Sequence, residues 1–314
     1  MKNKVLFYLE NSNHEYVSGA DIAKTLGISR MSVSKAVSEL RAEGAVIESS
    51  TKCGYKLIKG PDTLYAEAVK AHTKHRAVVY CHRCIGSTNE EAKKLAADGA
   101  SHGTVVISEE QTNGRGRRGR SFHSPAGTGL YMSIILRPEM LGDEVMYTVA
   151  AAVAVREVIA RYNARASIKW VNDIYIEKKK VCGILCEAIS DLESGSVSAV
   201  ICGIGINLTS PRGGFPDELK DKAGALDNDN ISRAKISAEV IDSLLDVLEH
   251  TPDKLIEQYS NHMMLTGKEI YYARGSESLR ATVVGVDGTG GLIVRCDGGV
   301  CEILRSGEVQ LEKF

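Results

Sequence analysis

Gly114-Arg-Gly-Arg-Arg-Gly-Arg120 places four arginines and three glycines in seven consecutive residues, with no apolar side chain among them. Such a run cannot pack as a strand or helix in a core, so it predicts a loop. Its glycines let the backbone approach a ligand closely, and each guanidinium offers a rigid fork of donors that suits a phosphate or a carboxylate. A solvated basic loop or a generic nucleic-acid patch would have the same composition.

The position of this arginine loop favours a binding site. Thr104–Ser108 before it and Leu130–Leu136 after it are continuous apolar runs, typical of buried strands. An anion-binding loop between two core strands is held where a rigid scaffold can position it.

Composition sets wide limits on the rest of the chain. A length of 314 residues suffices for two or three domains, and a hydrophobic content of 43% with 25% charged residues is ordinary for a globular protein. The net charge of −1 makes the arginine loop a local feature. No apolar run approaches the roughly 20 residues that cross a bilayer. We therefore expect a cytoplasmic protein without membrane contact.

The eight cysteines follow no disulfide-framework spacing, which fits a reducing compartment. Cys81 and Cys84 form a lone CxxC motif, without the second pair that a tetrahedral zinc site needs. Buried or incidental thiols are the favoured interpretation.

Residues 1–60 predict a winged helix-turn-helix. Two short helical segments precede a third in which Val33, Val37 and Leu40 share one face, and a hairpin follows. The third helix offers short polar and basic side chains to base edges and phosphates, so it predicts DNA binding, with a protein-binding winged helix as the alternative. The predicted DNA-binding residues are Ser29, Arg30, Ser32 and Lys35.

Residues 61–76 predict a helical linker after the Gly60-Pro61-Asp62 break, and residues 77–266 predict a central domain. Ser87 and Glu90 have the spacing of a helix capping box, so capping alone would explain them. Residues 143–162 predict a buried apolar helix. Lys180 stands at the start of a core strand. The glycines of a further strand, 199–207, indicate tight packing or close approach of a ligand.

Residues 267–314 change to short strands with glycine turns, which predicts a small β-barrel of SH3-like size. The fold class expected for the whole chain is therefore α+β.

Taken in order, the motifs resemble the family of bifunctional biotin–protein ligases that also repress the biotin operon. The resemblance covers essentially the whole chain. It is carried by Ser-Thr-Asn at 87–89, the arginine loop, Lys-Trp-Val-Asn-Asp at 169–173, Lys-Lys-Val-Cys-Gly-Ile-Leu at 179–185 and Gly-Ile-Asn at 205–207. It implies a central mixed β-sheet ligase core of the class II synthetase kind.

The resemblance implies an ATP-dependent reaction. Biotin and ATP form biotinyl-5′-AMP and pyrophosphate, and biotin then passes to a lysine of a biotin carboxyl carrier protein. The expected cofactors are biotin, ATP and Mg²⁺; the other expected partners are operator DNA and a second copy of the chain, in a homodimer promoted by ligand.

The resemblance also assigns site residues. Those expected to bind biotin are Ser87, Thr88, Asn89, Gln111, Gly114, Arg115, Gly116, Arg117, Arg118, Lys180 and Gly183. Those expected to serve the nucleotide are Phe122, His123, Lys169, Trp170, Asn172 and Asn207. Lys180, Arg115 and Arg117 are the expected catalytic residues, and Asp173 the expected Mg²⁺ ligand.

Two departures from the family pattern bear on the nucleotide. Val171 replaces a usual proline, and Phe122-His123 stands where an aromatic stacking pair is expected. The alternative function is a DNA-binding sensor of biotin or lipoate without transfer. The arginine loop and Lys180 favour the ligase, because a sensor needs no phosphate chemistry.

Overall fold

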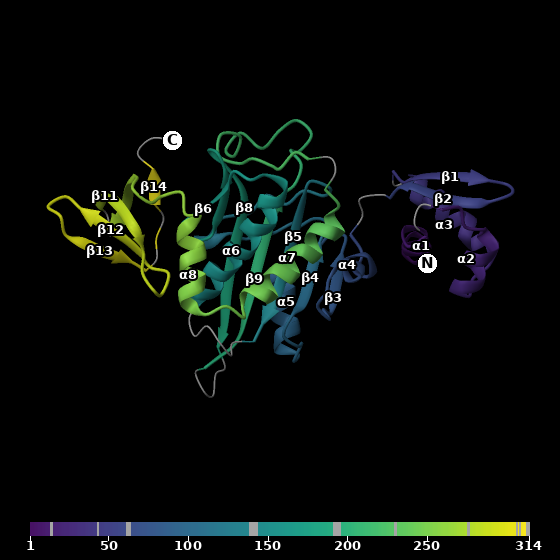
Figure 1. Ribbon diagram of the computed structural model, residues 1–314, viewed down its shortest axis with the longest axis horizontal. Helices are drawn as coiled ribbons and strands as arrows, with labels where there is room; N and C mark the ends of the chain where they lie inside the picture. The colour runs from purple at the N-terminus through teal and green to yellow at the C-terminus, as the bar shows by residue number, and fades with distance from the viewer. Residues whose placement is uncertain are drawn as a thin grey trace.

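The structure, a computed structural model, has three units in a row (Figure 1). The winged-helix unit and the C-terminal β unit lie at opposite ends of the central unit. The described residues are 1–12, 15–42, 44–60, 64–137, 144–190, 196–228, 231–274, 277–305, 307 and 309–311. Pro61 and Asp62, part of the predicted break, lie outside them. Within this range no helix is both long and apolar enough to cross a membrane.

The N-terminal unit has the predicted winged-helix order. It contains α1 (Lys2–Glu10), α2 (Gly19–Leu26), α3 (Arg30–Ala42) and the hairpin β1 (Val46–Ser50) and β2 (Gly54–Lys59). The Ser32 amide donates to Ser29 Oγ at 3.1 Å, so Ser29 caps α3 as expected. Val33, Val37 and Leu40 are buried, which leaves the polar face of α3 to solvent.

Helix α4 (Ala66–His72) follows the winged-helix unit and packs against α7 (Arg233–Val247) of the central unit. The residues after it are held by α7 as well, since His75 Nε2 lies 3.0 Å from Asp246 Oδ1 and the Lys74 amide donates to Asp242. At its other end, Tyr65 donates to Glu10 of α1. The predicted helical linker therefore contacts both units.

A mixed seven-stranded sheet forms the central unit, in the order β3-β4-β5-β9-β8-β7-β6. Among the strand pairs of this sheet that the structure describes, only β3–β4 is parallel. The strands are β3 (Val79–His82), β4 (Thr104–Ser108), β5 (Gly129–Leu136), β6 (Ala166–Lys169), β7 (Asp173–Ile176), β8 (Lys179–Ser190) and β9 (Val197–Asn207). The mixed sheet confirms the predicted core.

Helices cover both faces of this sheet, so its middle strands are apolar on both sides. Val105 and Ile107 pack in the main core with α6 (Glu144–Tyr162) and α7 (Arg233–Val247). Val106, between them, packs in a smaller core with α5 (Thr88–Ala97). The alternation explains why β4 is buried at every position.

The C-terminal unit follows α8 (Pro252–Asn261). Its strands are β10 (Glu269–Arg274), β11 (Glu277–Val286), β12 (Leu292–Cys296), β13 (Cys301–Leu304) and β14 (Val309–Leu311). They form an antiparallel sheet in the order β13-β12-β11-β10-β14. The small β unit was predicted; its closure into an SH3-like barrel stays a prediction.

A hydrogen bond from Trp170 links the central unit to the C-terminal unit. Trp170, 5% exposed, donates from Nε1 to the carbonyl oxygen of Gly290 at 2.9 Å. Gly290 has φ +83°, and a Cβ there would lie 3.0 Å from side-chain atoms of Val145 and Val149 of α6. This turn between β11 and β12 therefore packs closely against the central unit.

Candidate active site

The start of α5 brings three polar side chains below the arginine loop. Ser87 occupies the N-cap position, but its side chain accepts no capping hydrogen bond, so the capping-box interpretation is wrong. Thr88 and Asn89 are buried. The amide and hydroxyl of Thr88 both donate to Gln111 Oε1, at 2.8 and 3.1 Å. We call Ser87, Thr88, Asn89 and Gln111 the amide end of the site.

Asn89 is held by residues from three strands. Its Nδ2 donates to Glu187 Oε2 at 2.6 Å and to the Leu185 carbonyl at 3.3 Å, both on β8. Ser133 of β5 lies 2.6 Å from Asn89 Oδ1. On β9, Gly203 leaves the space, because a Cβ there would lie 2.1 Å from Asn89 Oδ1. Asn89 is thus fixed in orientation by donors, acceptors and shape together.

Glu187 ties this network to two cations. Lys93 Nζ donates to Glu187 Oε1 at 2.7 Å and to Glu90 at 3.2 Å. Burial alone would raise the pKa of Glu187. Hydrogen bonds from Lys93 and Asn89, together with the charges of Lys93 and Arg115, lower it by more, so its pKa lies below the ordinary value. Glu187 is therefore a carboxylate at neutral pH.

The arginine loop folds back on itself above the sheet. The Gly116 amide donates to the Arg120 carbonyl at 2.7 Å, and the Phe122 amide donates to the Gly114 carbonyl at 2.9 Å. A Cβ at Gly114 would lie 2.5 Å from the Phe122 carbonyl oxygen, so the crossing needs glycine. The predicted loop contains a single 3₁₀ turn, Arg117–Gly119.

The arginines of the loop have different environments. Arg115 Nη1 donates to Glu90 at 2.9 Å, and Arg117 Nη1 donates to Asn172 Oδ1 at 3.2 Å. Arg118 is exposed, with φ at 58°. Arg115 is therefore tied to α5, and Arg117 to the residue just before β7.

The floor of the site is a glycine row. Gly183 of β8 pairs with Gly205 of β9, and Leu185 pairs with Gly203, so these residues share one face. A Cβ at Gly205 would lie 2.4 Å from Phe122 Cε1, which identifies these glycines as the space for the Phe122 ring and for Asn89. The sequence left tight packing and ligand approach open, and the structure shows tight packing.

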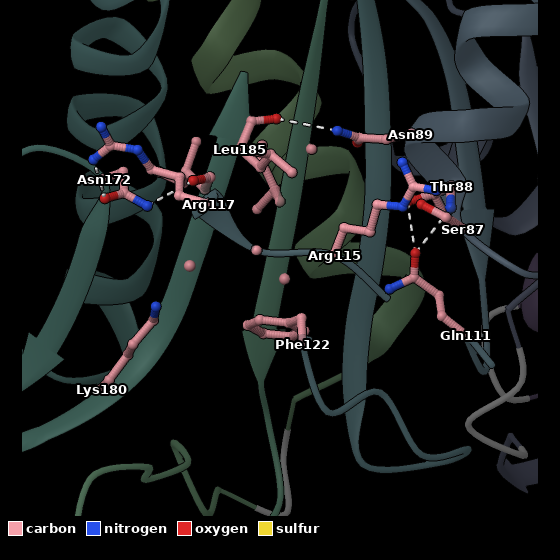
Figure 2. A pocket seen from close by; sticks show the side chains of 16 residues that line it. Ser87, Thr88, Asn89, Gln111, Arg115, Arg117, Phe122, Asn172, Lys180 and Leu185 are labelled. Carbon is pink, nitrogen blue, oxygen red and sulfur yellow. Dashed lines mark hydrogen bonds between the residues drawn. The ribbon is translucent and has the colours of Figure 1, made fainter. Parts of the chain in front are cut away.

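The far side of Phe122 carries Lys180, Asn172 and Asp173 (Figure 2 shows the first two). Lys180 Nζ lies 2.7 Å from Asp173 Oδ1. Asn172 is anchored by donating from Nδ2 to the Ile184 carbonyl at 2.8 Å. We call Arg117, Lys180, Asn172 and Asp173 the cationic end of the site.

A cavity of about 50 Å³ runs from the amide end to the cationic end. Ligand pockets usually have volumes of roughly 300–1,000 Å³, so a ligand must displace the arginines or Phe122 that now fill the space. The predicted residues that line it are Ser87, Thr88, Asn89, Gln111, Arg115, Gly116, Arg117, Phe122, Asn172, Lys180 and Gly183.

Other predicted residues lie outside this lining. Arg118 and His123 are exposed. Lys169 Nζ lies 5.4 Å from the centre of the Tyr175 ring. Asn207 donates to the Gly224 carbonyl at 2.9 Å. The structure places Trp170 at the junction with the C-terminal unit, where burial and its bond to Gly290 explain it without a nucleotide.

Gly114 and Asp173 also lie beside the lining without being part of it. The Trp170–Val171 peptide bond, where the family pattern has proline, is cis.

Several contributors were not identified from the sequence: Ser133, Glu187, Lys93, Gly203 and Gly205. They occupy ordinary strand or helix positions, far from their partners in the chain. Only the glycine spacing of β9 gave a signal, and it did not name Asn89 or Phe122 as the neighbour.

Asp173, the carboxylate at the cationic end, could hold Mg²⁺ only together with ligands from the substrate and water. Among the described residues no group of three or more His, Cys, Asp or Glu side chains could hold a metal ion. Mg²⁺ usually keeps several waters and binds one or two carboxylates together with substrate phosphates, and Asp173 suits that arrangement.

The predicted DNA-binding residues lie on α3, away from this cavity. Arg30 and Lys35 are exposed, as is Ser29, whereas Ser32 is half-buried. Ser29 Oγ lies 2.9 Å from Ser32 Oγ, so these two hydroxyls contact each other at the start of the helix.

Comparison with known proteins agrees with the three units. Residues 2–56 match the model described as HTH domain, residues 81–207 the Biotin/lipoate A/B protein ligase family, and residues 266–311 the Biotin protein ligase C terminal domain.

Relatives and solved structures match over long stretches. The Bifunctional ligase/repressor BirA of Bacillus subtilis (strain 168) is 33% identical over 326 residues, covering 99% of this chain and 98% of the relative. A Biotin--[acetyl-CoA-carboxylase] ligase of Paracoccus denitrificans is 32% identical over 68% of this chain and 92% of the relative. The structure of a biotin protein ligase from Aquifex aeolicus in complex with biotin and ATP matches with a TM-score of 0.64 at 28% identity, covering 75% of this chain and 98% of that one.

Proposed function

The chain belongs to the family of bifunctional biotin ligases and repressors, as its sequence predicted, and from that membership we propose how its cavity activates biotin. Biotin binds across the glycine row, with its ureido ring at the amide end and its carboxylate at the cationic end. ATP brings its α-phosphate to that carboxylate. The proposal is supported chiefly by one observation: a single cavity joins the amide end, Arg115, Arg117 and Lys180.

The amide end suits a neutral ring with one oxygen and two N–H groups. Hydroxyls and amides can donate to a carbonyl and accept from N–H groups, and the side chains of Thr88, Asn89 and Gln111 are already oriented by hydrogen bonds. A preoriented set loses little freedom on binding. Ser87, which makes no capping bond, is available to the ring as well.

The cationic end suits the reaction itself. When the biotin carboxylate attacks the α-phosphorus, a bond forms from carboxylate oxygen to phosphorus and the bond to pyrophosphate breaks. Two anions must approach, so closely placed donors and cations stabilise the transition state. Arg115 and Arg117 leave Glu90 and Asn172 for the reacting oxygens, and Lys180 neutralises the charge that develops.

We assign the nucleotide to the side of the cavity that carries Phe122 and Asn172. Lys169, Trp170, His123 and Asn207 remain predicted nucleotide residues. Asp173, with substrate phosphates and water, is the proposed Mg²⁺ ligand, and the ion would offset phosphate charge. In the second half-reaction an acceptor lysine of the carrier protein attacks the acyl carbon, and AMP leaves.

The assay for the ligase uses the full-length chain with biotin, ATP, Mg²⁺ and a biotin carrier domain. We expect pyrophosphate release without the carrier and an increase in carrier mass by one biotinyl group with it. Binding of biotin without either product would favour the alternative, a DNA-binding sensor of biotin or lipoate.

For regulation, we propose that α3 binds operator DNA and that ligand promotes a homodimer, which would present two winged helices to two half-sites. Arg30→Ala and Lys35→Ala should each weaken DNA binding and reduce its salt dependence, as lost phosphate contacts do. A gel-shift titration with and without biotin and ATP tests the switch. Equal affinity in both would leave a DNA-binding ligase without biotin control.

Removing residues 1–60 should abolish DNA binding and leave the ligase reaction, because α1, α2, α3 and the hairpin pack mainly on one another. Loss of both activities would contradict the predicted boundary at residue 60. The limits at 76 and 266 are predictions of the same kind.

A further inference from the structure

Lys180 lies on the face of β8 opposite to the one that a regular strand would give it. Side chains alternate between two faces along a strand, and Gly183 and Leu185 of β8 both line the cavity. Regular alternation would therefore turn Val181 to the cavity and Lys180 to the core. Instead, Val181 is 1% exposed in the main core, and Lys180 lines the cavity, where its Nζ would lie 3.1 Å from a Cβ at Gly183. The alternation of β8 is thus interrupted near Val181.

A β-bulge at Val181 accounts for this change of face. Ile174 of β7 pairs with Cys182, and the following residue, Tyr175, pairs with Lys180. Two consecutive residues of β7 therefore face three of β8, and Val181 is the extra one. A bulge re-aims the side chains next to it. Here Val181 and Cys182 both enter the main core, and Lys180 turns to the cavity.

The segment 222–226, which we call the strap, lies beside the bulge. In the described register β9 pairs with β8 from Cys182 onward, whereas Lys180 pairs with the strap in a parallel bridge. The Lys180 amide donates to the Lys222 carbonyl at 2.8 Å, and the Gly224 amide donates to the Lys180 carbonyl at 2.9 Å. The strap therefore satisfies both backbone groups of Lys180.

The strap also packs closely on both neighbours of Lys180 in the chain. A Cβ at Gly224 would lie 2.6 Å from Lys179 Cβ and 3.7 Å from Val181 Cγ1. Lys179 Nζ donates to the Lys220 carbonyl at 2.8 Å, just before the strap. This close approach requires glycine at position 224, and it holds the backbone on either side of Lys180.

Asn207, the last residue of β9, holds the strap at two points. Its Nδ2 donates to the Gly224 carbonyl at 2.9 Å, and its backbone carbonyl accepts from the Leu226 amide at 3.1 Å. Asn207 is itself fixed by its pairing with Gly129 of β5. The side chain of Asn207 is therefore joined to the backbone of Lys180 through a single residue, Gly224.

We propose that Asn207 is a positioning residue for Lys180: its side chain holds Gly224, and the strap stabilises the bulge that turns Lys180 into the cavity. This role rests on the proposed function, because it affects catalysis only if Lys180 acts on the reacting oxygens. It differs from the predicted nucleotide contact of Asn207. Loss of a contact with ATP raises KM for ATP, whereas a misplaced Lys180 slows the chemical step.

Asn207→Ala removes the hydrogen bond to Gly224. We expect kcat for biotin-dependent pyrophosphate release to fall about tenfold, the scale of one hydrogen bond, with KM for ATP unchanged. Asn11→Ala is the matched control, because Asn11 Nδ2 also donates to a backbone carbonyl, that of Phe7, at 2.7 Å in the winged-helix unit. A raised KM for ATP with a wild-type kcat in Asn207→Ala would overturn the positioning role and favour the nucleotide contact.

A double-mutant cycle tests whether Asn207 acts through Lys180. In a Lys180→Ala background, Asn207→Ala should cost no further rate, because the side chain that it positions is already gone. Additive losses in the double variant would show that Asn207 acts independently of Lys180, and would overturn the proposal.

Amide hydrogen exchange of the full-length chain tests the strap without an activity. Asn207→Ala should speed exchange of the Lys180 and Gly224 amides about tenfold, with exchange over residues 184–189 unchanged. Unchanged exchange at Lys180, or faster exchange along the whole of β8, would overturn the local role of Asn207. Absence of pyrophosphate release from the wild type would instead overturn the proposed function, whatever the exchange rates.

Discussion

The amide end and the cationic end share one cavity but are built differently. At the amide end, Thr88, Asn89 and Gln111 are joined by hydrogen bonds of 2.6–3.1 Å, from Thr88 to Gln111 and from this set to Ser133, Ser124 and Glu187. At the cationic end, Arg117 has one contact of 3.2 Å with Asn172, and Lys180 has an ion pair without a hydrogen bond. The polar groups of the amide end are therefore held in place by several hydrogen bonds, whereas the cations of the cationic end contact Asn172 and Asp173.

The difference follows from the ligand groups that each end is proposed to bind. Neutral hydrogen bonds give little net free energy unless their partners are fixed beforehand, so rigidity matters most at the amide end. Fixed unpaired cations would repel one another, and carboxylate or amide partners avoid that cost until anions arrive. Substitutions at the cationic end should therefore mainly lower kcat, whereas substitutions at the amide end should mainly weaken biotin binding.

The largest effect is expected at the cationic end. Lys180→Ala should reduce kcat for pyrophosphate release about 10²–10³-fold, with biotin affinity changed little, because its contact strengthens as charge develops. Steady-state release and equilibrium biotin binding measure the two quantities. Lys178→Ala, in the exposed turn nearby, is the control. A rate near wild type in Lys180→Ala would make Lys180 a structural lysine.

The arginine loop tests retention of the activated acid. Arg117→Gly should let biotinyl-AMP dissociate about tenfold or more faster, because one guanidinium fork is lost while glycine keeps the loop flexible enough to form. Arg118→Gly, at the exposed neighbour, should have the smaller effect. Stopped-flow trapping of the released intermediate compares them, and equal dissociation from wild type and Arg117→Gly would contradict the assignment.

At the amide end, loss of shape should weaken binding. Gly203→Ala places a methyl group against Asn89 Oδ1, so biotin affinity should fall about tenfold, the scale of one misplaced hydrogen bond, before any change in chemistry. Gly86→Ala is matched, because its Cβ would meet nothing within 4 Å. Calorimetric titration measures both. A Gly203→Ala variant with normal biotin affinity but low kcat would contradict the assignment of binding to the amide end and of chemistry to the cationic end.

The smallest effect concerns acid. The pKa of Glu187 in the folded protein lies below its ordinary value of 4.5, so Glu187 stabilises the fold above that value and the benefit disappears as pH falls through the lower folded pKa. The melting temperature of the wild type should exceed that of Glu187→Gln at neutral pH, and the difference should vanish in acid. A difference that persists or grows below the folded pKa would contradict this.

Much of the fold could be predicted where the sequence pattern is local. Thr104–Ser108 and the helix at 143–162 are long apolar runs, and both are confirmed as β4 and α6. Strand β6 was missed, since its four residues are too few for their alternating burial to stand out as a sequence pattern. Helix α8 also has only two fully buried side chains, which left a weak pattern.

The site was predictable through the order of its motifs, not through its contacts. Lys180 and the arginine loop were identified because cations in such positions are chemically conspicuous. Glu187 lies 98 residues from Asn89 in the chain, and no local pattern joins them. Trp170 stands inside a motif of predicted site residues and its indole packs against another unit, so its nucleotide role stays a prediction.

That indole also limits how the molecule can be divided. The Trp170–Gly290 bond links the last unit of the chain to the segment that continues directly into Asn172 and Asp173. Cutting the chain before the C-terminal unit would expose a large apolar ring and leave its N–H group to water. The ligase core is therefore not easily passed on as a separate module. A chain that lost the C-terminal sheet would need a second substitution, at position 170, to keep Asn172 and Asp173 in position.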